Sequence, residues 1–231
     1  MLPLLLVALT ATDTYSARLE ALGATRGRLA RAHATSRGAA RAAVLEEARS
    51  AVISTLRDDV FPAWHGTPWT FSGTSSRPGS GSIACGFFVG TVLAHAGFVV
   101  DRIALGRLAS EHIALSLTED ANLARYSDRP AAEVAAATVA RGPGLYLLGL
   151  DHHAALILVD ERGATLVHST YYGEPIVKSE PLLGDNPFDF SRYRVVAKLL
   201  DDRMMRRWLA GERFEARSSS GRRGRRGSSG R

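Results

Sequence analysis

The only cysteine of this chain lies where a thiol could act as a nucleophile. Cys85 sits in the segment SGSIACGFFVG, and we expect a helix from about residue 83 to residue 96 with Ser82 as its N-cap. The thiol then falls in the first helical turn, where unpaired backbone N–H groups and the helix dipole favour the thiolate. A single cysteine also excludes disulfide frameworks and cysteine-based zinc sites. Cys85 is therefore either a nucleophile or a small residue of an apolar core.

Three histidines downstream could supply the base that a thiol nucleophile needs. They are His152, His153 and His168, on two successive predicted strands. If Val159 pairs with Ala164 around the turn DERG, His153 and His168 share one face as diagonal neighbours and His152 points the other way. A three-residue loop would reverse that choice. Because even-length loops are commoner, we predict His153 as the base and His168 as its orienting partner, with His152 as the alternative base.

The same three histidines could instead hold zinc. Adjacent histidines of a strand face opposite ways, however, and no carboxylate lies at the spacing of a metalloprotease helix. We therefore predict no metal at this site and no organic cofactor.

An aromatic loop precedes the cysteine. Residues 62–82 (PAWHGTPWTFSGTSSRPGSGS) combine Gly, Pro and Ser with three large aromatic side chains that need burial, which is typical of an ordered loop. We predict that Trp64 and Trp69, together with His152, contact a substrate. The histidine of the loop, His65, is a weaker candidate because a loop histidine is more often solvated.

Helical signals come first and strand signals last, which predicts an α+β fold. Residues 16–60 show helical periodicity, and Gly23 and Gly38 are expected to divide them into two helices that end before Pro62. Pro130 and Gly142 bound another helix, and a short one is expected over 202–210. Five strands of an antiparallel meander are predicted at 145–150, 154–159, 164–172, 175–181 and 193–199.

The succession of these motifs resembles the NlpC-type, papain-like cysteine peptidases of bacterial cell walls. The matching segments are WHGTPW (64–69), ACGFFVGTVLAHAGF (84–98), HAALILV (153–159) and LVHS (166–169), which span about half of the chain. The resemblance implies a papain-like fold in which the nucleophile helix packs on the antiparallel meander. It also implies Cys85 as nucleophile, His153 as base and His168 as third member, with the backbone N–H of Cys85 in the oxyanion hole.

The positive charge of the chain is concentrated at its C-terminus. The formal net charge is +6, and residues 217–231 hold six arginines and no acid. Removing these six from the 29 bases leaves 23 bases against 23 acids. We therefore expect a neutral folded part and a disordered tail over 211–231, which could bind anionic polymers without sequence specificity. No specific nucleic-acid partner is predicted.

The N-terminal segment bears on localisation. Residues 2–11 form an apolar run too short to span a bilayer but suited to the core of a signal peptide. We expect export to the periplasm or the medium, with a cytoplasmic protein whose first helix starts buried as the alternative. The expected organisation is an apolar or signal segment (1–15), a helical region (16–60), a papain-like catalytic domain (61–210) and the tail (211–231).

These observations favour a thiol hydrolase that cleaves a peptide-type amide bond, which the resemblance narrows to a peptidoglycan stem peptide. Two other functions compete with it. The fold could be a catalytically weak binding module whose groove is lined by Trp64, Trp69, Tyr171 and Tyr172. Alternatively, the basic tail could tether an inert domain to an anionic surface.

Overall fold

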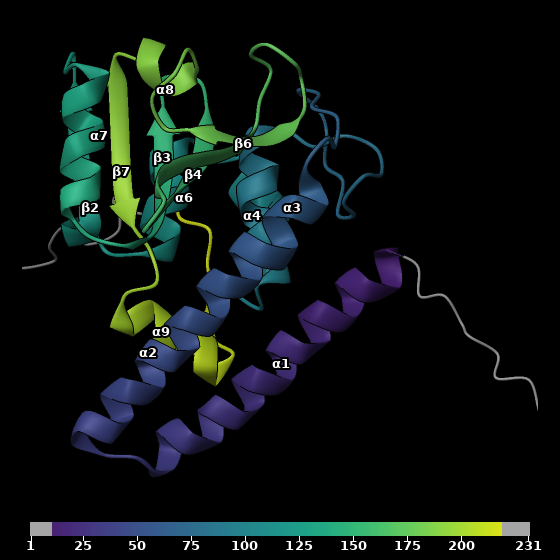
Figure 1. The fold of residues 1–231 in the computed structure, drawn as a ribbon, viewed down its shortest axis with the longest axis vertical. Helices are drawn as coiled ribbons and strands as arrows, with labels where there is room; N and C mark the ends of the chain where they lie inside the picture. The colour runs from purple at the N-terminus through teal and green to yellow at the C-terminus, as the bar shows by residue number, and fades with distance from the viewer. Residues whose placement is uncertain (1–10, 219–231) are drawn as a thin grey trace, which may run out of the picture.

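The computed structural model describes residues 11–218, with side chains from residue 14 on, and has an α+β architecture (Figure 1). The helices are α1 (Ala11–Thr35), α2 (Gly38–Thr55), the π-helix η1 (Leu56–Val60), α3 (Phe61–Trp64), α4 (Cys85–His95), α5 (Arg102–Gly106), α6 (Ser110–Leu117), the 3-10 helix η2 (Asp120–Asn122), α7 (Ala131–Ala140), α8 (Pro187–Phe190) and α9 (Asp202–Ala210). The strands are β1 (Val99–Val100), β2 (Leu123–Ser127), β3 (Gly144–Leu150), β4 (Ala154–Asp160), β5 (Gly163–Ser169), β6 (Val177–Pro181), β7 (Tyr193–Lys198) and β8 (Arg213–Phe214).

The central sheet has the strand order β2-β7-β3-β4-β5-β6, with antiparallel pairing throughout. Strands β3 to β6 form the predicted meander. The predicted turn is confirmed, because Val159 pairs with Ala164 and Asp160 with Gly163. The prediction for β7 was incomplete: β7 does not follow β6 in the sheet but pairs with β3 on the other side, and the edge strand β2 was not predicted. Its sequence, LARYS, is half exposed and lacks a clear period of two.

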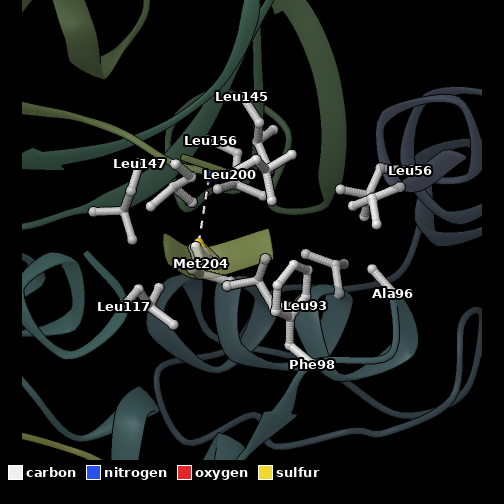
Figure 2. Packing of buried hydrophobic residues seen from close by; sticks show 14 of the residues in the cluster. Leu56, Leu93, Ala96, Phe98, Leu117, Leu145, Leu147, Leu156, Leu200 and Met204 are labelled. Atoms are coloured by element: carbon white, nitrogen blue, oxygen red, sulfur yellow. Dashed lines mark hydrogen bonds between the residues drawn. The ribbon is translucent and has the colours of Figure 1, made fainter. Parts of the chain in front are cut away.

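Helices cover both faces of this sheet. Strand β3 is buried along its whole length, and its alternate side chains enter two separate clusters. Leu145 and Leu147 pack in the larger cluster with helices α4, α6 and α9. Tyr146 and Leu148 pack in the smaller cluster against α7 and α8. Figure 2 shows part of the larger cluster, where the backbone N–H of Leu200 contacts the sulfur of Met204 at 3.3 Å.

The N-terminal region forms a helical hairpin that runs down one side of the molecule (Figure 1). The predicted break at Gly38 is correct, and its φ of +49° explains why glycine is needed there. The predicted break at Gly23 is wrong, because α1 continues through it. One glycine inside a helix costs only about 1 kcal/mol, and the buried neighbours Leu22 and Leu29 anchor the helix on either side. The helical region also continues to Trp64, because Pro62 sits in the first turn of α3, where a missing N–H is tolerated.

The C-terminal boundary lies later than predicted. Residues 211–218 are ordered, and β8 pairs in parallel with β1. Phe214 is completely buried and its ring lies 5.9 Å from that of Phe98. The sequence RF was too short to stand out as a strand. The rest of the expected tail, residues 219–231, and the apolar segment at 1–10 on which the signal-peptide prediction rests lie outside the described residues. Within residues 11–218, no helix is long and apolar enough to cross a membrane.

The burial of Phe214 predicts a stabilising role for a segment that the sequence assigned to a tail. Phe214→Ala should lower the free energy of unfolding by about 3 to 5 kcal/mol, because it removes a fully buried ring and leaves a cavity. The matched control is Phe71→Ala, since Phe71 is 88% exposed, and it should cost about 0.5 kcal/mol or less. Urea unfolding measures both values. Equal effects of the two substitutions would contradict the position of β8.

Candidate functional site

Cys85 is the first residue of α4. The preceding loop fixes this helix start, because Ile83 N–H donates to Pro68 O and Ala84 N–H donates to Gly73 O, each at 2.9 Å. The predicted N-cap was wrong: Ala84 occupies that position without a side-chain cap, and the Ser82 hydroxyl instead contacts that of Thr70 at 2.7 Å. The N–H groups of the first turn consequently have no capping side chain. They remain available to an anion at the position of the thiol.

Burial and hydrogen bonding act on the thiol in opposite directions. Burial raises the pKa of Cys85, and the backbone N–H groups of Ala154, Gly86 and Cys85 itself oppose that rise without cancelling it. The expectation of a stabilised thiolate is therefore wrong for the resting protein. Cys85 is a half-buried neutral thiol at neutral pH. Its contact with Ala154 also places it beside the residue that follows His153.

A chain of three polar side chains starts at His153. His153 Nε2 lies 3.0 Å from His168 Nδ1, and both rings are buried. His168 Nε2 lies 3.0 Å from Glu180 Oε1, an ion-pair distance at which the bond direction departs from ideal hydrogen-bond geometry. The other carboxylate oxygen of Glu180 contacts Lys178 Nζ at 2.8 Å. The diagonal placement of the two histidines predicted from the hairpin register is thus confirmed.

The remaining nitrogen of His153, Nδ1, is buried and has no hydrogen-bond partner among the described residues. When Nε2 of His153 carries the proton and donates to His168, Nδ1 presents a lone pair and can accept a proton. The same arrangement leaves a proton on His168 Nε2, facing the Glu180 carboxylate. One set of tautomers therefore fits all three groups and leaves His153 Nδ1 as the free base.

Burial keeps both histidines neutral. It is the main reason that the pKa of His153 falls to about 3, with a smaller repulsion from His168. Burial also lowers the pKa of His168, although Glu180 opposes that effect. For Glu180, burial alone would raise the pKa, but contacts with His168 and Lys178 outweigh it and lower the pKa. The series of polar side chains from His153 through His168 therefore ends in the ionised carboxylate of Glu180 at neutral pH.

Glu180 was not anticipated from the sequence. On the β5–β6 pair it lies opposite Leu166, which makes it a diagonal neighbour of His168. The β4–β5 turn is two residues long and fixes its register, whereas residues 170–176 link β5 to β6 through a longer loop that the sequence does not constrain in this way. The alternating charges of VKSEP were the available signal.

Of the three residues predicted to contact a substrate, two lie at a cavity and one is in the core. Trp69 and His152 line a cavity of about 570 Å³ together with Cys85, so both are placed to meet a ligand. The prediction that Trp64 contacts a substrate is wrong, because Trp64 is fully buried and its ring packs against those of Phe88 and His95. The periodicity of the helical region continues through Trp64, and this turns its side chain into the core.

The histidines His65 and His95 have partners outside this site. His65 Nε2 contacts the Ser179 hydroxyl at 2.8 Å, and His95 Nδ1 contacts the Tyr15 hydroxyl at 2.7 Å. Within residues 11–218, no group of three or more His, Cys, Asp or Glu side chains could hold a metal ion. The facing nitrogens of His153 and His168 make a hydrogen bond to each other instead.

Comparison with known protein families, curated proteins and solved structures found no match to this chain. The described residues bring together a thiol at a helix N-terminus and, one residue before the backbone N–H that contacts this thiol, a buried imidazole with one free nitrogen. The other nitrogen of this imidazole contacts His168, which in turn faces Glu180.

The low pKa of His153 makes stability depend on pH. The unfolded chain protonates this histidine near its ordinary pKa of 6.5 and the folded chain only at about 3. The contribution of His153 to the free energy of unfolding is therefore fully present above pH 6.5 and is lost as the pH falls below that value. His153 alone should contribute a loss of about 2 kcal/mol between about pH 7.5 and pH 5.

Urea unfolding at these two pH values measures this loss. His153→Asn should reduce the pH dependence by about 2 kcal/mol, leaving the part due to other buried histidines. The matched control is His152→Asn, which changes an exposed neighbour and should leave the dependence unchanged. An identical dependence in wild type and His153→Asn would show that His153 is not buried in its neutral form.

Proposed function

We propose that this protein is a papain-like, NlpC-type thiol hydrolase that cleaves a peptide-type amide bond, with Cys85 as nucleophile and His153 as general base. The observation that carries the proposal is the state of His153. One nitrogen is bound to His168, the other is buried without a partner, and the backbone N–H of the next residue contacts the Cys85 sulfur. Most buried polar groups of a protein core have a hydrogen-bond partner, so a buried imidazole nitrogen that is free to accept a proton supports a role as base.

In the first step, the Cys85 sulfur attacks the carbonyl carbon and its proton passes to His153 Nδ1. The carbonyl oxygen becomes an oxyanion that accepts a hydrogen bond from the backbone N–H of Cys85. When this intermediate collapses, the C–N bond breaks, and His153 returns the proton to the leaving amine. A thioester remains on Cys85. His153 then takes a proton from water as the water oxygen attacks the thioester carbonyl carbon. The C–S bond breaks, His153 returns the proton to the sulfur, and the acid is released.

His168 and Glu180 serve as positioning residues in this scheme. When His153 becomes an imidazolium, its Nε2 proton is held by His168, and the Glu180 carboxylate stabilises the developing positive charge through His168. Because the resting pair is a neutral thiol and a neutral imidazole, charge separation occurs only during attack. The polar chain is therefore of use mainly in the transition state.

The resemblance to cell-wall peptidases adds finer proposals. It suggests a peptidoglycan stem peptide as substrate, a bacterial source and export to the periplasm or the medium. The arginine-rich residues 217–231 would then hold the enzyme near anionic polymers by salt-sensitive, sequence-independent attraction.

A second candidate function is a binding module that has lost catalysis. Exposed aromatic side chains favour it, because Phe71, Tyr171 and Phe190 are about half exposed or more around the candidate site. Cys85→Ala separates the two functions. It abolishes hydrolysis if the thiol is the nucleophile, and it leaves peptide binding intact in either case.

A dipeptidyl chloromethyl ketone tests the roles of Cys85 and His153. At pH 7 it should label Cys85, as measured by mass spectrometry, and His153→Ala should slow labelling about 100-fold because the base is lost. His152→Ala distinguishes the alternative base and should leave the rate within about 3-fold, since one contact in an open site contributes little. Iodoacetamide at high pH, where the thiol ionises unaided, is the control for thiol access. Equal labelling of wild type and His153→Ala would refute the dyad.

Glu180→Gln tests the end of the polar chain. The amide is isosteric and keeps a carbonyl oxygen facing His168, but it lacks the charge, so labelling of Cys85 should slow about 10-fold. The pKa of His168, followed by NMR titration, should fall further because Glu180 opposes the lowering. Glu174→Gln is the matched control, since Glu174 is an exposed residue of the β5–β6 loop. An unchanged pKa of His168 together with an unchanged rate would remove Glu180 from the mechanism.

A further inference from the structure

Two cavities meet at the candidate dyad. The first, of about 570 Å³, is lined by Cys85, Trp69, Phe71, Phe87 and Arg107, and we call it the thiol cavity. The second, of about 380 Å³, is lined by His153, Asp151, Tyr172 and Phe190, and we call it the histidine cavity. His152 and Tyr171 line both cavities. The two cavities are therefore neighbours that share one wall.

The chemistry of the proposed reaction assigns one half of a substrate to each cavity. The acyl half becomes covalently attached to the sulfur of Cys85, so it must occupy space next to the thiol. The leaving amine receives its proton from His153, so it must lie on the histidine side. It follows that the thiol cavity receives the acyl half and the histidine cavity the leaving half.

The thiol cavity is apolar in character. Trp69, Phe71 and Phe87 present aromatic rings, and Trp69 is braced by Tyr171, with ring centroids 5.5 Å apart. Phe71 is the most exposed large hydrophobic residue among the described residues, at 88%. An exposed phenyl ring at the rim of an aromatic cavity gains contacts when an apolar group enters and excludes water.

Charge adds a second selection. Among the described residues, Arg107 is the only Lys, Arg, Asp or Glu side chain that lines the thiol cavity. It is exposed and makes no ion pair within the described part of the chain, although the Asp101 carboxylate, which does not line the cavity, attracts it. No acid is present there to receive a positive charge, and Arg107 repels one.

We infer, on the basis of the proposed function, that the substrate is a peptide-type amide whose acyl half carries bulky apolar side chains and no positive charge. The acyl half packs on Phe71 and Phe87 beside the thiol. A cationic acyl half is rejected because it meets the positive charge of Arg107 without any carboxylate among the lining residues to offset it. This inference replaces the stem peptide that the resemblance suggests, because the side chains of a stem peptide are small or charged. The leaving half falls to the smaller histidine cavity, which Asp151 helps to line.

Three probes with one reactive group test the inference. They are dipeptidyl chloromethyl ketones with the sequences Leu-Phe, Ser-Ser and Lys-Lys, and the second-order rate of Cys85 labelling is measured for each. The Leu-Phe probe should react about 10-fold faster than Ser-Ser and faster still than Lys-Lys, because it alone buries apolar surface in the thiol cavity. The rates are divided by the free-thiol rate of each probe with glutathione.

Two variants test the residues. Phe71→Ser should remove most of the advantage of Leu-Phe over Ser-Ser, whereas the matched control Val139→Ser, an exposed apolar residue of α7, should keep it. Arg107→Glu should raise the rate with Lys-Lys about 10-fold relative to Leu-Phe, because the charge at the rim is reversed. Both positions are exposed, and thermal unfolding of each variant checks that the fold is retained.

The outcomes separate the inference from the proposed function. Labelling of Cys85 that depends on His153 but is equal for the three probes, or fastest for Lys-Lys, would overturn the substrate class and leave the hydrolase proposal in place. Failure of all three probes to react faster than a free thiol, with iodoacetamide still reaching Cys85 at high pH, would overturn the hydrolase proposal and the inference with it.

Discussion

The hydrogen bond between His153 Nε2 and His168 Nδ1 is the interaction on which the candidate site depends. It joins the residue before β4 to a residue of β5, and it forms only because the two-residue turn at Glu161 and Arg162 sets the register of this hairpin. A slip of one residue would turn His168 to the other face of the sheet and leave two buried imidazoles without partners. The register of one hairpin therefore decides both the stability and the chemistry of the site.

Burial gives this site its electrostatic character. The thiol has a raised pKa and His153 a lowered one, each mainly because it is removed from water. A pair of this kind is neutral at rest, in contrast to the thiolate that the helix position alone would favour. Low polarity also strengthens the interaction of a developing imidazolium with His168 and Glu180. The same burial that makes the resting groups unreactive thus increases what the polar chain can contribute during a reaction.

The aromatic loop joins the core to the open side of the site. Trp64 packs in the core, Trp69 lies at the thiol cavity and Phe71 reaches solvent, all within eight residues. Backbone bonds from the loop also fix the start of α4, through Pro68 and Gly73. The loop therefore positions the nucleophile and shapes the surface around it. Side chains so close in sequence differ in role because the chain changes direction at each turn of the loop.

The α+β order of elements, the β4–β5 register, the helix start near Cys85 and the pairing of His153 with His168 could be predicted from the sequence, because they follow from local periodicity and turn length. Capping rules failed at Cys85, where Ala84 takes the place predicted for Ser82. Other features required the three-dimensional structure. The place of β7 beside β3, the burial of Trp64 and Phe214, and the arrival of Glu180 at His168 depend on long-range packing and on a loop whose length fixes no register. The protonation of the thiol was also decided there, since a pKa responds to the whole surrounding volume rather than to sequence neighbours.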